Sequence, residues 1–96
     1  MIKKFTLNKH GVTHIVEANV FEILSVQMQG DNLVVWISTS KASHLRSLTF
    51  LTAYTGEDAP QGYYIATVQD NNLVYHVYEV WTTKLNNYSA STTLNC

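Results

Sequence analysis

The amino-acid sequence predicts an all-β fold, a small antiparallel β-sandwich or half-open barrel built of hairpins. Three observations carry this prediction. Val, Ile, Thr, Tyr, Phe and Trp, which suit a pleated and half-buried surface, make up 37 of the 96 residues. β-branched residues recur in every stretch, so no amphipathic helical run of ten or more residues is found. Turn residues recur about every 8–12 residues, as they do in sandwiches and barrels.

Each strand is expected between two groups of turn residues. The turns fall at 9–11, 30–31, 40–43, 56–61 and 70–71, and the loop at 56–61 holds the only proline. The strands then lie near residues 2–8, 12–18, 22–29, 32–39, 45–54, 62–69 and 73–81. A stretch rich in Asn, Ser and Thr follows them. We therefore divide the chain into one β domain, residues 1–81, and a polar C-terminal tail or docking arm, residues 82–96.

Two of the expected hairpins have similar sequences. Both run from a small hydroxyl residue and Val-Gln through a turn to Asn-Leu-Val, starting at Ser25 and at Thr67. With two-residue turns at Gly30-Asp31 and Asp70-Asn71, Trp36 and His76 occupy equivalent positions that face away from the core. In the first hairpin Val26 faces Val35 and Met28 faces Leu33. The predicted core contains Leu24, Val26, Met28, Leu33, Val35, Ile37, Val68 and Leu73.

Composition excludes several classes of function. Six Lys and Arg against seven Asp and Glu give a net charge of −1, which argues against binding of nucleic-acid polymers. A single cysteine excludes an internal disulfide and multi-cysteine metal sites. Apolar runs reach only five residues, so neither a membrane span nor a signal peptide is expected. The charged fraction of only 14% suggests that part of the surface is covered, which favours a homo-oligomer.

The residues that most often carry catalysis or bind metals form no recognisable set. His10 and His14 are interpreted as solvated turn histidines, because no third metal ligand is placed by spacing. Glu57 and Asp58 stand next to Pro60 and are interpreted as solvated loop charges. The Gly-x-Ser-x-Gly motif of hydrolases does not occur. The sequence therefore predicts no catalytic residue, no metal site and no cofactor.

Six residues are candidates for binding a small ligand at a subunit boundary. Arg46 is the only arginine, and its planar fork suits a phosphate or a carboxylate. Trp36 and His76 offer flat side chains for stacking on a base. Tyr54, Thr55 and Gly56 end a strand at a point where backbone amides can meet an anion. The alternatives are a surface charge for Arg46, interface packing for Trp36, and a plain strand-to-loop exit for residues 54–56.

Several segments of the chain resemble an uncharacterised family of small bacteriophage and prophage proteins. The pattern covers about four-fifths of the chain, and its segments are Ile23-Leu24-Ser25-Val26-Gln27, Leu33-Val34-Val35-Trp36, Thr55-Gly56, Tyr64-Ile65-Ala66-Thr67-Val68-Gln69 and Leu73-Val74-Tyr75-His76-Val77-Tyr78-Glu79. The block that ends the pattern is its most specific part. Members usually end near that glutamate, so the tail from Trp81 onward departs from the family.

The resemblance implies a phage-encoded accessory protein that acts in the host bacterial cytoplasm, and it implies no catalytic residues. We expect a non-enzymatic protein that binds a small anionic nucleotide-type ligand. Phage proteins of this size class include counter-defence sponges that sequester host immune nucleotide signals. The alternative is an interaction module that binds and inhibits a host protein through exposed Tyr and Trp. A nucleotide-cleaving enzyme with His44 or His76 as acid or base is the third hypothesis.

Overall fold

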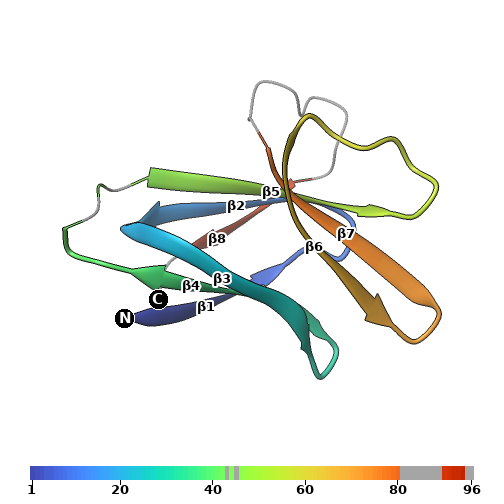
Figure 1. Ribbon diagram of the computed structural model, residues 1–96, viewed down its shortest axis with the longest axis horizontal. Helices are drawn as coiled ribbons and strands as arrows, with labels where there is room; N and C mark the ends of the chain where they lie inside the picture. The colour runs from blue at the N-terminus through green and yellow to red at the C-terminus, as the bar shows by residue number, and fades with distance from the viewer. Residues whose placement is uncertain (43, 45, 81–89, 95–96) are drawn as a thin grey trace.

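The chain folds into eight β-strands and no helix within the residues that the structure describes (Figure 1). This computed structural model describes residues 1–42, 44, 46–80 and 90–94, with the backbone alone for residues 16–18 and 90–94. The strands are β1 (Ile2–Leu7), β2 (Gly11–Ala18), β3 (Val20–Gln29), β4 (Asn32–Thr39), β5 (Arg46–Tyr54), β6 (Gly62–Asp70), β7 (Leu73–Val80) and β8 (Ala90–Leu94). The predicted all-β class is confirmed.

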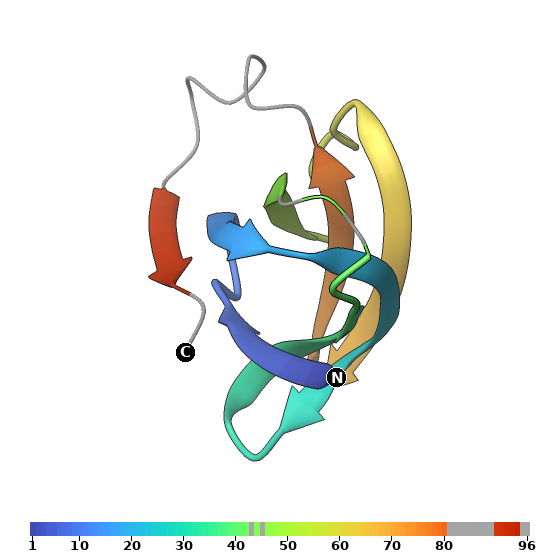
Figure 2. The same ribbon diagram turned by 90° about the vertical axis from the view of Figure 1, so that its left-hand side faces the viewer.

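The strands form two sheets that pack face to face without closing into a barrel (Figure 2). One sheet has the strand order β1-β4-β3, and the other has the order β6-β7-β5-β2-β8. Neighbouring strands are antiparallel, except that β8 pairs with β2 in parallel. The core lies between the sheets and contains Phe5, Leu7, Ile15, Val20, Val26, Leu33, Val35, Ile37, Leu48, Phe50, Val68, Tyr75 and Val77.

Strands β3 and β6, each outermost in its own sheet, lie side by side along one edge of the sandwich (Figure 2). The ladder of β3 shifts register at Phe21 and at Leu24, and the ladder of β6 shifts at Ile65. Leu24 is inserted between two ladder pairs of β3, and Ile65 is inserted in the same way in β6. A bulge bends its strand and increases the local twist. We infer that the bulges at Leu24 and Ile65 help these edges to approach each other.

Strand β5 is buried on both faces. Leu48 and Phe50 belong to the core, and Leu51, which points to the opposite face, packs with Val12 and Val80 in a second cluster. The strand extends from one end of the sandwich to the other, about 26 Å at ~3.3 Å per residue (Figure 1). We call these the Arg46 end and the Tyr54 end.

The expected hairpin register is confirmed for β3 and β4. Val26 pairs with Val35 and Met28 with Leu33, and the turn is at Gly30-Asp31. Gly30 has a left-handed φ of +58°, which glycine adopts without steric cost.

The turn predicted at Asp70-Asn71 is wrong by one residue and lies at Asn71-Asn72. Asp70 still pairs with Leu73, and Asn71 takes the left-handed φ of +54° that asparagine tolerates better than most residues. His76 pairs with Thr67 as Trp36 pairs with Ser25, so their equivalent positions are confirmed.

Two predicted core residues are exposed, which corrects that part of the prediction. Leu24 is 43% and Leu73 is 48% exposed. Leu24 is the extra residue of the β3 bulge and has no ladder partner, while Leu73 lies next to the tip of its hairpin. Met28 is partly buried against the core. The remaining five, Val26, Leu33, Val35, Ile37 and Val68, are buried as predicted.

Of the predicted tail, the structure describes only residues 90–94, which form β8 beside β2. The rest of the predicted tail and Trp81, the last residue of the final predicted strand, lie outside the described residues. Among the described residues no helix has the length and apolar character needed to cross a membrane.

Two leucines of the same hairpin test the bulge. Leu33 is fully buried, so Leu33→Ala is expected to lower the free energy of unfolding by about 2–5 kcal/mol. Leu24→Ala is expected to lower it by less than about 1 kcal/mol, because the bulge already exposes that side chain. Urea denaturation measures both losses, and equal losses would contradict the bulge.

Candidate functional site

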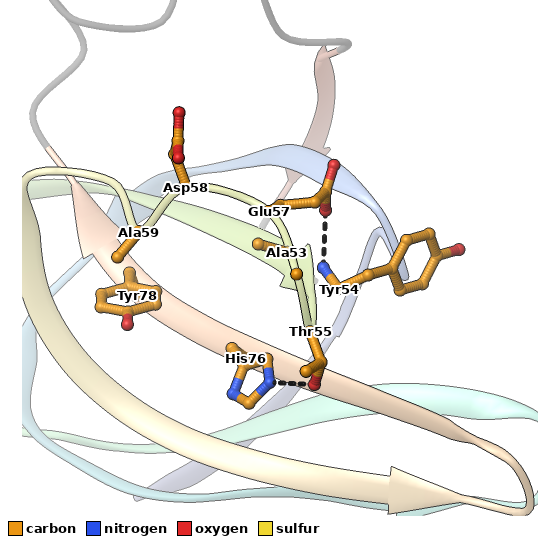
Figure 3. Close-up of a pocket in the computed structure, with 9 residues that line it drawn as sticks. Ala53, Tyr54, Thr55, Glu57, Asp58, Ala59, His76 and Tyr78 are labelled. Carbon is orange, nitrogen blue, oxygen red and sulfur yellow. Dashed lines mark hydrogen bonds between the residues drawn. The ribbon is translucent and has the colours of Figure 1, made fainter.

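A pocket lies at the Tyr54 end, where the loop after β5 stands above the outer face of β7 (Figure 3). We call it the Tyr54 pocket. Its volume is about 180 Å³, and its lining residues are Ala53, Tyr54, Thr55, Gly56, Glu57, Asp58, Ala59, His76 and Tyr78. Sites for whole drug-sized ligands measure about 300–1,000 Å³. The Tyr54 pocket therefore suits a single ring or a small polar group.

The loop side of the pocket is a turn held by two reciprocal hydrogen bonds. The Glu57 N–H donates to the Tyr54 carbonyl at 3.2 Å, and the Tyr54 N–H donates to Glu57 Oε1 at 2.6 Å. Gly56 is the third residue of this turn and has a φ of +99°, where a side chain would be strained. The Glu57 side chain therefore has a fixed position beside the end of β5.

His10, from the connection between β1 and β2, fastens this turn to a second loop. Its ring stacks on Tyr54 with centroids 4.4 Å apart and planes 4° from parallel, and its Nε2 lies 2.9 Å from both carboxyl oxygens of Glu57. The backbone N–H of Tyr54, followed by the hydrogen bond to His10, lowers the pKa of Glu57 from its ordinary value of 4.5. Glu57 is therefore ionised at neutral pH.

His76 is held between two threonine hydroxyls. Its Nε2 lies 2.7 Å from Thr55 Oγ1 and its Nδ1 lies 3.2 Å from Thr67 Oγ1 (Figure 3 shows the contact with Thr55). Thr67 Oγ1 is also 2.6 Å from the Tyr64 hydroxyl. A neutral imidazole has one N–H and one acceptor nitrogen, so the Thr55 hydroxyl either donates to His76 or accepts from it. Both arrangements hold the His76 ring in one orientation.

The pair of Thr55 and His76 lacks the carboxylate that completes a catalytic triad. Thr55 and His76 place a hydroxyl beside an imidazole, but the group behind the imidazole is the neutral Thr67 hydroxyl, which cannot stabilise an imidazolium as a carboxylate does. The lining residues include two carboxylates and neither Lys nor Arg. The negative charge of the lining therefore disfavours a phosphate.

The structure brings four of the six predicted ligand-binding residues together. Tyr54, Thr55, Gly56 and His76 line the Tyr54 pocket. Arg46 lies at the opposite end of β5, where its Nη1 is 3.9 Å from Glu79 Oε2.

Trp36 lies in the other sheet, half-buried on β4 between its ladder partners Lys4 and Ser25. Neither Trp36 nor Arg46 lines the pocket.

Sequence reasoning missed the part that Glu57 and His10 play in the pocket. Both residues are exposed, as expected of solvated groups, yet each holds the turn in place. A carboxylate just beyond a Thr-Gly turn can accept a hydrogen bond from the unpaired N–H at the end of a strand. The position of Glu57 after Thr55-Gly56 could therefore have predicted this contact.

His10, His14 and His76 have separate partners, and His14 Nδ1 lies 3.0 Å from Thr49 Oγ1. The described residues contain no group of three or more His, Cys, Asp or Glu that could hold a metal ion.

The fold and the pocket define a small two-sheet β-sandwich domain with a polar pocket at one end. The chain belongs to the family described as a domain of unknown function (DUF7352), which matches residues 1–87. The prediction of an uncharacterised family is thus confirmed, but the match runs past Trp81, where the sequence was expected to depart from the family. Neither the curated proteins nor the solved structures include a match.

The turn at Glu57 predicts a specific response to acid. Folding lowers the Glu57 pKa, so its contribution to stability is present above the unfolded value of 4.5 and is lost as the pH falls through the lower folded value. Glu57→Gln is therefore expected to show a smaller loss of thermal stability than the wild type below pH 4.5. Asp58→Asn, which neutralises the neighbouring carboxylate, is the control and should keep the wild-type profile.

An NMR titration separates the two causes of the Glu57 shift. In His10→Ala the Glu57 pKa is expected to rise and still stay below 4.5, because the Tyr54 N–H, the larger cause, is retained. A Glu57 pKa at or above 4.5 in the wild-type protein would contradict the fixed turn.

Proposed function

We propose that this domain is a non-enzymatic binding protein that captures a small nucleotide-type ligand. The observation that carries the proposal is the Tyr54 pocket, whose polar groups are ordered by contacts within the protein. His76 is held between Thr55 and Thr67, and Glu57 is held by the Tyr54 N–H and His10. Groups that are already ordered lose little conformational entropy on binding, which favours affinity.

The charge and size of the pocket select the part of the ligand that enters it. The Glu57 and Asp58 carboxylates in the lining repel phosphates, while the Thr55 hydroxyl and the His76 imidazole can hydrogen-bond with the edge of a nucleobase. The volume of about 180 Å³ fits a base better than a whole nucleotide, and Tyr78 and His76 supply flat surfaces. The base therefore occupies the Tyr54 pocket, and the phosphate stays outside it.

In its specific form the proposal describes a phage-encoded counter-defence sponge that acts in the host bacterial cytoplasm as a homo-oligomer. The sequence resemblance to small phage proteins supports the origin and the compartment. The hydroxyl behind His76, in place of a carboxylate, supports sequestration over cleavage. The low charged fraction and the exposed apolar residues at the sheet edges support association of copies.

Capture followed by heat release tests the function. The protein is incubated with cyclic and ADP-ribose-type nucleotides, separated from unbound ligand and heated, and the released molecule is identified. An intact nucleotide released only on heating supports the proposal. An altered nucleotide would show an enzyme, and capture of none of these nucleotides would overturn the proposed ligand class.

Variants of the pocket are expected to weaken this capture. His76→Ala and Thr55→Val each remove a neutral hydrogen-bonding group and should each cost about 0.5–1.5 kcal/mol of binding free energy. Arg46→Gln is the matched control, because Arg46 lies at the other end of β5 and should leave the affinity unchanged. Calorimetry measures the three affinities, and a loss confined to Arg46→Gln would place the ligand elsewhere.

A second candidate function, an interaction module for a host protein, is favoured by the edge that β3 and β6 form. Phe21, Leu24, Tyr63 and Tyr64 are all exposed on these two strands. Outermost strands can accept an added strand from a partner, and large apolar side chains beside them can anchor it.

The substitution Leu24→Ser distinguishes the two functions. It is expected to weaken binding of a protein partner and to leave nucleotide capture unchanged. Light scattering of the variant also tests whether the same edge joins copies of the chain.

A further inference from the structure

A larger cavity lies at the Arg46 end, away from the Tyr54 pocket. We call it the basic cavity. Its volume is about 440 Å³, and its lining residues are Met1, Lys3, Asn19, Thr39, Ser40 and Lys41. Three separate segments meet there: the start of β1, the connection between β2 and β3, and the chain that leaves β4 (Figure 1). The cavity is therefore a product of the fold and not of one loop.

Backbone hydrogen bonds hold the walls of the basic cavity in place. The Thr39 N–H donates to the Met1 carbonyl at 2.7 Å, and the Met1 amino group donates to the Thr39 carbonyl at 2.9 Å. The Ser40 N–H donates to the Asn19 carbonyl at 3.0 Å. Each of the three segments is thereby tied to another, so the lining groups keep their positions without a ligand.

The charges of the lining residues have one sign. Lys3 and Lys41 are two of only six Lys and Arg residues in the chain, and the lining includes neither Asp nor Glu. Lys3 alternates with the buried Phe5 and Leu7, so its side chain leaves β1 on the core-facing side, at the end of the sandwich.

Three further charged residues, Arg46, Glu79 and Glu22, lie near this end of the sandwich. Arg46 lies at the same end, because it pairs with Ala18, the residue before Asn19. The Glu79 carboxylate forms an ion pair with the Arg46 guanidinium. Glu22 lies on the outer face of its sheet, beside Ser38, and does not line the cavity.

Polar groups of the cavity can donate hydrogen bonds to an oxyanion. Ser40 Oγ accepts a hydrogen bond from the Ala42 N–H at 3.2 Å, which leaves the Ser40 hydroxyl proton to donate to a ligand. Asn19 Oδ1 is buried with no hydrogen-bond partner among the described residues, so the amide can turn toward the cavity without breaking a hydrogen bond at that oxygen. Two ammonium groups and a hydroxyl donor suit the oxygens of a phosphate.

The geometry points to a phosphate-binding site in the basic cavity, with Lys3 and Lys41 supplying the charge and Ser40 a hydrogen bond. This site is separate from the Tyr54 pocket and goes beyond the function proposed for that pocket. The ligand class is inorganic phosphate or the phosphate group of a small soluble molecule. A cavity of about 440 Å³ is large enough for the group and part of its carrier.

An NMR titration of the isotope-labelled protein with inorganic phosphate tests the site. Saturating shifts are expected at the amides of Thr39, Ser40 and Lys41, and not at Thr55 or His76. Lys3→Gln and Lys41→Gln are each expected to raise the dissociation constant for phosphate roughly threefold to tenfold, as for a partly exposed charge-assisted contact. Added sodium chloride should weaken binding, because salt screens these charges.

Lys9→Gln is the matched control. It makes the same change in net charge at the connection between β1 and β2, the far end of β1 from the cavity, and should keep the wild-type affinity. Phosphate shifts that are absent, or that do not saturate, overturn the site. An equal loss of affinity in Lys9→Gln and Lys3→Gln overturns it as well, because net charge alone would then explain binding. Phosphate shifts confined to Thr55 and His76 would assign the anion to the Tyr54 pocket instead.

Discussion

The burial of β5 on both faces is the constraint on which the rest of this structure depends. Every side chain from Leu48 to Ala53 is buried, so a ligand can reach the strand only at its ends, where Ala53 lines the Tyr54 pocket. Polar groups that a ligand could contact are therefore found at the two ends of β5, which the neighbouring strands do not cover. Buried polar groups usually have a hydrogen-bond partner. The Thr49 hydroxyl has one in His14, whereas Thr52 Oγ1 has none among the described residues.

The two ends of β5 differ in charge, and the distance between them keeps them independent. The Tyr54 end carries Glu57 and Asp58, and the Arg46 end carries Lys3 and Lys41. Charges separated by about 26 Å of strand are screened from one another, because the Debye length is about 8 Å at physiological ionic strength. One domain can therefore offer an acidic pocket and a phosphate-accepting cavity, and each keeps its own preference.

The sequence predicted the pairing of Val26 with Val35 correctly, because side chains alternate with a period of two and Gly30 marks one clear turn. It could not predict the exposure of Leu24, because a bulge adds one residue without changing the apolar pattern around it. The second turn was misplaced for a different reason. Three adjacent turn-forming residues, Asp70, Asn71 and Asn72, gave equal local signals, and the ladder pair of Asp70 with Leu73 decided among them.

The candidate site could be predicted from the sequence only in part. The equivalence of Trp36 and His76 and their direction away from the core were readable from two similar hairpins. The two hairpins belong to different sheets, however. Side chains that point away from the core therefore reach opposite outer surfaces of the sandwich. Equivalent positions are thus kept apart within one copy of the chain. His76 meets Thr55 because Ala53 and His76 are partners across β5 and β7, a long-range pairing that no local pattern encodes.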